Sequence, residues 1–193
     1  MSIKILGGLA KGRSLLVPKG QLIRPTSVLL KRRLFDSIQD FSEYEFYDIC
    51  AGSGAMALEA WSRGAQKCFL LEKNRSVYSL MVKNVAMLQE KFPSESKMRV
   101  IGSQNGAMEK WLGRTQDCFK NERAVIFVDP PYEKHGLYKD YTLKILKDES
   151  VQAQIWVESD KDKGLPLEYW QDQGLSPYKV YKQGGSYIAL FKR

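Results

Sequence analysis

The stretch YDICAGSGAMALEA, residues 47–60, joins an apolar run to a helical pattern through a turn that contains Gly52 and Gly54. Because glycine has no Cβ atom, the backbone at such a turn can adopt conformations that other residues disfavour and lets a ligand approach closely. The start of the following helix presents N–H groups at the same place. The stretch predicts a strand, a ligand-binding turn and a helix, which together are typical of the opening unit of a parallel α/β sheet.

The rest of the chain continues this alternation of short apolar runs and helical patterns. Strands are predicted at 45–50, 67–72, 98–102, 123–128 and 153–159, and helices at 55–62, 75–89, 106–119 and 138–148. Strands that alternate with helices form right-handed crossovers, so we expect a mostly parallel sheet with both faces covered. Two alternating apolar stretches around Gly184 and Gly185 predict an antiparallel hairpin at one sheet edge.

The N-terminal segment has a different pattern. Apolar stretches at 3–6 and 14–17 flank a segment rich in glycine and basic residues, which predicts a hairpin with a basic tip. Leu30, Leu34 and Ile38 then recur at helical spacing, and Thr26 or Ser27 is the expected N-cap of that helix. We therefore divide the chain into an N-terminal hairpin and helix extension, residues 1–40, and an α/β domain, residues 41–193.

The charge balance favours a polyanionic partner. Lys and Arg number 30 and Asp and Glu 22, so the formal net charge is +8. A basic surface binds nucleic acid by releasing counterions from the phosphates, although a basic balance can also serve solubility alone. The length of 193 residues otherwise suits one compact domain with a small appendage.

Metal and triad chemistry find little support in the sequence. Cys50, Cys68 and Cys118 are widely spaced, without a CxxC pair, and His135 is the single histidine. A structural zinc site or a Ser-His-Asp triad is therefore disfavoured, and the cysteines are expected to be reduced core residues. The sequence contains no 18-residue apolar run and no signal-peptide pattern, so a cytoplasmic protein without membrane contact is expected.

Two acidic residues accompany the glycine turn. Asp48 ends the first strand just before the turn, and Glu72 ends the second, where a carboxylate can accept both hydrogen bonds of a ribose diol. The letters GSGAMA also satisfy the dinucleotide fingerprint G-x-G-x-x-A, which leaves a nicotinamide oxidoreductase as an alternative. Asp48 is better suited to a cationic, amine-bearing ligand than to a pyrophosphate, which favours S-adenosylmethionine over NAD.

The tetrapeptide DPPY, Asp129 to Tyr132, follows the buried run AVIFV, residues 124–128. Prolines fix the backbone, so the Asp129 carboxylate and the Pro130 carbonyl would hold preset positions as acceptors. An exocyclic amine of a nucleobase donates two hydrogen bonds to such a pair, and Tyr132 could stack on the base for ~1–3 kcal/mol. In a doubly wound sheet this strand lies beside the first, so DPPY is expected at the glycine turn.

In this order, YDICAGSG, LLEKN and VDPPY resemble Rossmann-like S-adenosylmethionine-dependent methyltransferases that modify nucleobase amino groups. The opening IKILGGLAKGRSLLVPKGQLIRPTS, followed by LF, is similar to the bacterial RsmD family, which methylates the exocyclic N2 of a guanine in 16S ribosomal RNA. The resemblance runs over nearly the whole chain. It includes SRGA at 62–65 and the glycine-containing C-terminal hairpin.

The resemblance implies a seven-stranded sheet and a set of functional residues. Cofactor contacts are implied at Asp48, Ala51, Gly52, Ser53, Gly54 and Glu72, and guanine contacts at Asp129, Pro130, Pro131 and Tyr132. RNA contacts are implied at Lys4, Lys11, Arg13 and Arg24. The implied partner is ribosomal RNA or the assembling small ribosomal subunit, and a monomer without a metal ion is expected.

The chain departs from the family pattern at two places. After RPTS the family reads approximately D-R-V-R-E, whereas this chain has VLLKR, so Val28 and Arg32 replace acids. The acid at the Glu position of this pattern is expected to brace the N-terminal arm or the cofactor pocket, so its replacement by Arg32 puts the local geometry of the arm in question. After the third strand, where an acid often binds the adenine amine, Gln104 offers an amide oxygen instead.

These departures keep two further hypotheses open. The chain could methylate adenine N6 or another RNA or DNA with the same chemistry. Alternatively, it could bind RNA without catalysing methylation. In both methylation hypotheses, a flipped or unpaired base would enter between the glycine turn and DPPY.

Overall fold

The described part of the chain forms a seven-stranded sheet of order β5-β4-β3-β6-β7-β9-β8 in the computed structural model, which covers residues 3–18, 25–93, 98–102, 119–130, 136 and 142–192. The strands are β3 (Glu45–Asp48), β4 (Lys67–Glu72), β5 (Met98–Gly102), β6 (Ala124–Val128), β7 (Gln154–Asp160), β8 (Lys179–Gln183) and β9 (Ser186–Phe191). β3 to β7 pair in parallel, whereas β9 pairs antiparallel with both β7 and β8. The predicted mostly parallel, seven-stranded sheet with an antiparallel edge hairpin is confirmed.

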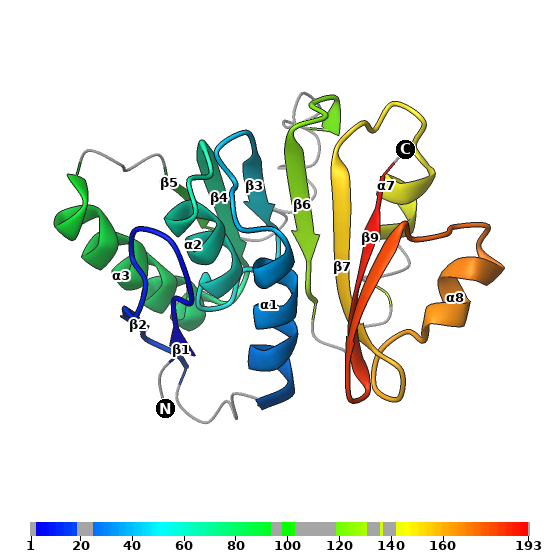
Figure 1. Ribbon diagram of the computed structural model, residues 1–193, viewed down its shortest axis with the longest axis horizontal. Coiled ribbons are helices and arrows are strands. Elements are labelled where there is room, and N and C mark those ends of the chain that lie inside the picture. The colour runs from blue at the N-terminus through cyan, green and yellow to red at the C-terminus, as the bar shows by residue number, and fades with distance from the viewer. Residues whose placement is uncertain are drawn as a thin grey trace.

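Helices cover both faces of this sheet, as predicted. Alternate residues of a strand point to opposite faces, so Phe46 joins one core cluster and Tyr47 the other. The cluster around Phe46 includes side chains of α1 (Pro25–Ser37), α2 (Ala55–Ser62) and α3 (Arg75–Lys91). The cluster around Tyr47 includes side chains of α7 (Leu143–Lys147) and α8 (Leu167–Asp172). Figure 1 shows α1, α2 and α3 side by side on one face.

The predicted N-terminal hairpin is present and lies over α2 and α3 (Figure 1). Its strands are short, β1 (Ile3–Lys4) and β2 (Ser14–Leu15), and Ile3 pairs with Leu15. The Gly12 N–H extends the pairing by donating to the Ile5 carbonyl at 2.8 Å. Ile5, Ala10 and Leu15 are each 1% exposed and belong to the same core cluster as Phe46. The hairpin is therefore packed onto the α/β layers by apolar contacts.

α1 follows the predicted hydrophobic spacing but not the predicted cap. Leu30 and Leu34 are buried and Ile38 packs against the same cluster. The expected N-cap at Thr26 or Ser27 is wrong, because the helix already begins at Pro25. Proline suits a first helical position, since its fixed φ is helical and its missing N–H would have no partner within the helix.

The C-terminal part contains a helix that the sequence patterns did not predict. α8 has six residues, a length at which apolar periodicity gives no clear signal. Pro166 precedes it and Gly174, with φ of 75°, follows it, and these two residues are the local signals of its ends. α7 is shorter than the predicted helix at 138–148, of which residues 138–141 lie outside the described ranges. The predicted helix at 106–119 lies outside them too, except for Phe119.

The cysteines in the described part of the chain are not joined by a disulfide. Cys68 is buried and Cys50 is half-buried, and both are free thiols, while Cys118 lies outside the described residues.

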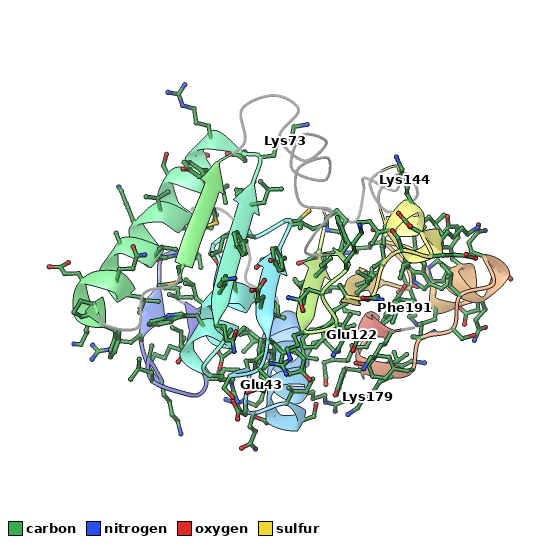
Figure 2. All side chains as sticks on the ribbon, turned by 90° about the horizontal axis from the view of Figure 1, so that it is seen from above. Glu43, Lys73, Glu122, Lys144, Lys179 and Phe191 are labelled. Carbon is green, nitrogen blue, oxygen red and sulfur yellow. The ribbon has the colours of Figure 1, made fainter. Side chains whose placement is uncertain are left out.

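Arg123 and Glu43, just before β6 and β3, form an exposed ion pair at 2.9 Å. In Figure 2, Glu43 lies on the opposite side of the molecule from Lys73, which follows β4. Within the described residues, we found no helix with the length and apolar character needed to cross a membrane.

Candidate active site at the carboxyl edge of the sheet

The order of the strands creates a switch point between β3 and β6. The chain passes from β3 outward to β4 and β5, and then returns to β6 on the other side of β3. In open α/β sheets, ligands bind beyond the carboxyl ends of the strands at such a reversal. Asp48 is the last residue of β3, Glu72 the last of β4, and Asp129 directly follows β6. Three carboxylates therefore come from three neighbouring strands to one edge.

The glycine turn has the geometry that its sequence predicts. Gly52 has φ of 55° and Gly54 has φ of 82°, both in the left-handed region. A Cβ atom at Gly54 would lie 2.7 Å from Leu70 Cδ2, so the second glycine is required for packing of the turn on β4. A Cβ atom at Gly52 would meet no described atom within 4 Å. Among the described residues, nothing therefore crowds the backbone at Gly52 on the side where a Cβ atom would lie.

Glu72 holds the turn through its carboxylate. Its Oε2 accepts the Gly52 N–H at 2.9 Å, and its Oε1 accepts the Asn74 N–H at 2.6 Å. Asn74 in turn caps α3 by accepting from Ser76 and Val77. A carboxylate offers about four acceptor positions, so Glu72 retains capacity for the hydroxyl groups of a ligand. This arrangement is compatible with the predicted ribose-binding role of Glu72.

Asp48 is a buried carboxyl group with an orphan acceptor. It is 2% exposed, its Oδ2 accepts the Ala57 N–H at 3.4 Å, and its Oδ1 has no partner among the described residues. Burial raises the pKa of Asp48 to about 8, and the charges of Asp129 and Glu72 contribute in the same direction. A buried acceptor without a partner is costly unless a ligand fills it. The site can therefore receive a cationic or hydrogen-bonding group at Asp48.

Cys50 lies among the three carboxylates. Burial raises the pKa of its thiol, and Asp129, Asp48 and Glu72 raise it further through their charges. A thiol with a raised pKa stays protonated at neutral pH and is a poor nucleophile. The charges of all three acids therefore act on Cys50, in agreement with their position at one edge of the sheet.

The structure describes only part of the predicted site. Asp129 is half-buried and Pro130 is buried at the switch point. The backbone of Asp129 hydrogen-bonds to the side chain of Cys50, which directly precedes the turn formed by Ala51 to Gly54. The predicted residues Gln104, Pro131 and Tyr132 lie outside the described residues. On the hairpin, Lys4, Lys11 and Arg13 are exposed, whereas Arg24 also lies outside the described part.

Buried polar residues that the sequence analysis missed attach the hairpin to the helices. Glu59 on α2 is fully buried and accepts the Leu6 and Gly7 N–H groups at 2.8 Å each. Ser62, also on α2, accepts the Ala10 N–H at 2.8 Å and donates to the Gly7 carbonyl at 2.6 Å. The available signal was a polar side chain inside the apolar pattern AMALEAW, because buried polar groups need partners.

α1 contributes a buried basic residue, Lys31, directly before Arg32, the position at which the family pattern has an acid. Lys31 is buried, lies 3.2 Å from Glu59 Oε2, and donates to the Ala55 carbonyl at 2.8 Å. Arg63 completes the cluster, with Nε 2.9 Å from Glu59 Oε1. Burial lowers the pKa of Lys31, while Glu59 opposes this shift. Arg32 itself is exposed, so its replacement of an acid leaves the anchoring of the hairpin to Glu59 intact.

Comparison with known proteins adds relatives that match most of the chain. A family model described as "Conserved hypothetical protein 95" matches residues 3–192. Ribosomal RNA small subunit methyltransferase D of Escherichia coli strain K12 is 33% identical over 168 residues, which are 85% of this chain and 78% of that protein. The protein of the same name from Haemophilus influenzae is 30% identical over 190 residues, 93% of each chain. The solved structure of Escherichia coli yhhF has a TM-score of 0.71 and 27% identity, over 100% of this chain and 98% of that one.

Proposed function

The chain belongs to the conserved hypothetical protein 95 family, the RsmD family of ribosomal RNA methyltransferases, and from this premise we propose that it transfers a methyl group from S-adenosylmethionine to the exocyclic N2 of a guanine in 16S ribosomal RNA. The observation that carries the proposal is the convergence of Asp48, Glu72 and Asp129 at the switch point. Membership in the family supports ribosomal RNA as the substrate class. The choice of guanine N2 rests on the DPPY tetrapeptide together with the N-terminal sequence.

The site fits the cofactor through three features. The buried Asp48 with its orphan Oδ1 suits the ammonium group of a methionine moiety beside a sulfonium. Glu72 at the end of β4 suits the ribose diol. No described atom crowds Gly52, which leaves room beside the backbone of the turn that Ala51, Ser53 and Gly54 complete. Gln104 is proposed to accept from the adenine amine.

The chemistry is a direct displacement. The cofactor supplies a methyl group on a positively charged sulfur. The carbon–sulfur bond breaks as a nitrogen–carbon bond forms, the sulfur keeps the bonding electron pair, and the amine nitrogen loses one proton. Asp129 and the Pro130 carbonyl accept the two N–H groups of the amine, which favours localisation of its lone pair on nitrogen, and Asp129 or solvent takes the proton. Positioning of this kind can lower the activation free energy by ~7–11 kcal/mol.

The exposed cations of the hairpin give the proposed RNA-binding surface. Lys4, Lys11 and Arg13 belong to the hairpin that lies over α2 and α3, and α2 begins at the glycine turn (Figure 1). Contacts from such side chains to phosphates position an RNA without reading its sequence. Arg24 is proposed to extend this surface.

The test is methyl transfer to unmodified 16S ribosomal RNA and to small ribosomal subunits assembled with it. The protein is incubated with S-adenosylmethionine carrying a labelled methyl group, and the RNA is digested to nucleosides. We expect label in N2-methylguanosine, and a loss of at least about a hundredfold in rate for Asp129→Ala. Label in N6-methyladenosine would assign the adenine alternative. RNA binding that does not need the cofactor, without any methyl transfer, would show that the protein is a noncatalytic RNA-binding protein.

A further inference from the structure

Asn84 on α3 connects the N-terminal hairpin to the glycine turn through one side chain. It is fully buried. Its Oδ1 accepts the Leu16 N–H at 2.8 Å, and its Nδ2 donates to the Leu16 carbonyl at 3.0 Å. The same Nδ2 donates to the Ser53 carbonyl at 2.9 Å. The amide thus pairs with the residue that follows β2 and, on its other side, with the middle residue of the turn.

These three hydrogen bonds use both N–H groups of the amide and one lone pair of its oxygen. Because the group is buried, no bulk water is available to replace a lost partner, and an unpaired buried donor is costly. If the turn moved and the Asn84 amide rotated to keep its hydrogen bond to Ser53, its hydrogen bonds to Leu16 would be strained or broken. The positions of the hairpin and of the turn are therefore linked by a short, rigid connection.

We infer that Asn84 is a positioning residue that couples cofactor binding at the turn to RNA binding on the hairpin. The inference rests on the proposed function, because it needs a cofactor at residues 51–54 and RNA on the hairpin. A ligand that fixes the Ser53 carbonyl also fixes Asn84 and, through it, the hairpin strand at Leu16. Coupling between two binding sites is reciprocal, so RNA on the hairpin tightens cofactor binding by the same factor.

A second attachment of the hairpin provides a matched control. Ser62 holds the hairpin at Gly7 and Ala10 through two hydrogen bonds, and its side chain contacts no residue of the turn in these bonds. Ser62 lies at the last position of α2, whereas the turn precedes the first. Ser62→Ala therefore weakens the hairpin without breaking the connection to Ser53, and Asn84→Ala breaks it.

The experiment measures the affinity of S-adenosylhomocysteine by calorimetry, with and without saturating unmodified 16S ribosomal RNA. For the unmodified protein we expect RNA to tighten binding by about fivefold or more, within the usual range of coupling between sites. Asn84→Ala should reduce this ratio to about 1, while Ser62→Ala weakens RNA binding and keeps the ratio. A ratio that survives in Asn84→Ala, or that is already about 1 in the unmodified protein, overturns the inference. Failure of the proposed function itself is distinguishable, because the unmodified protein would then bind no S-adenosylhomocysteine, or would bind the cofactor but not 16S ribosomal RNA, which a direct RNA-binding titration shows.

A measurement on the unmodified protein keeps the test independent of whether Asn84→Ala folds. Hydrogen exchange of the Leu16 N–H, which donates to Asn84, should slow when S-adenosylhomocysteine is added. The Ala10 N–H, which donates to Ser62, should change less. Equal responses of the two amides, or no response of Leu16, would contradict a connection through Asn84.

Discussion

Glu59 Oε2 lies 3.2 Å from Lys31 Nζ, and both side chains are buried where α2 meets α1. The same carboxylate also pairs with Arg63 and accepts two N–H groups of the hairpin. A single acid therefore joins α1, α2 and the N-terminal hairpin. Removing one partner of such a cluster leaves the other charges buried and unpaired, which is more costly than the loss of an exposed pair.

Glu59→Ala should therefore lower the free energy of unfolding by about 3–5 kcal/mol, measured by urea denaturation. The matched control is Glu43→Ala, because Glu43 pairs with Arg123 at 2.9 Å but both side chains are 66% exposed. The control should change stability by less than about 1 kcal/mol. Equal effects of the two substitutions would show that the buried cluster does not anchor the hairpin.

The raised pKa of Asp48 predicts a pH-dependent affinity for a cationic cofactor. In the free protein, burial and the neighbouring acids raise the pKa of Asp48 to about 8, so the carboxyl group is mostly protonated at pH 7. A cationic ligand binds the ionised form, so binding must release a proton below pH 8. The affinity for S-adenosylhomocysteine, whose amino group is cationic, should rise between pH 6 and 8 by at most about tenfold per pH unit. Calorimetry in two buffers of different ionisation enthalpy measures the proton release directly.

The stability of ligand-free Asp48→Asn checks the same pKa by an independent route. The folded protein keeps the Asp48 proton between the ordinary pKa near 3.8 and about 8, whereas the unfolded chain has released it. The free energy of unfolding contributed by this group therefore falls as pH rises through that window. Asp48→Asn removes this fall, so its stability relative to the unmodified protein should be higher at pH 8.5 than at pH 5. A constant difference would contradict the raised pKa.

The sequence predicted the layers and the carboxyl edge because these follow from local patterns. Runs such as KCFLLE and the helix from Ala55 to Ser62 have the length and period that decide their type. The attachments of the hairpin could not be predicted in this way. Asn84 contacts Leu16 across 68 positions of the chain, and no local pattern encodes which backbone group a buried amide will meet. The wrong cap at Thr26 or Ser27 has a local cause, since Pro25 competes with both as the start of α1.

The two glycines of the turn should respond differently to alanine. At Gly54 the new methyl group meets Leu70 Cδ2 at 2.7 Å in addition to the strain of a positive φ. We expect Gly54→Ala to cost about 2–5 kcal/mol of stability, from left-handed strain and overpacking together. At Gly52 only the strain applies, about 1–2 kcal/mol. The Gly52 methyl group enters the proposed cofactor space, so Gly52→Ala should weaken binding of S-adenosylhomocysteine by about tenfold or more. Thermal unfolding and calorimetry separate the two effects.

The exposed cations of the hairpin should determine how RNA binding depends on salt. Lys11 and Arg13 flank Gly12 at the basic tip, and each phosphate contact that they make releases about one counterion. Lys11→Ala and Arg13→Ala should each weaken binding of 16S ribosomal RNA and lower the slope of log K against log salt by about 0.7–1. Lys179→Ala, an exposed cation at the start of β8 on the edge strand, is the control and should leave the slope unchanged. Filter binding between about 50 and 200 mM salt measures the slope. If Lys179→Ala lowered it as much as the hairpin substitutions do, RNA binding would depend on the net charge of the protein and not on the hairpin.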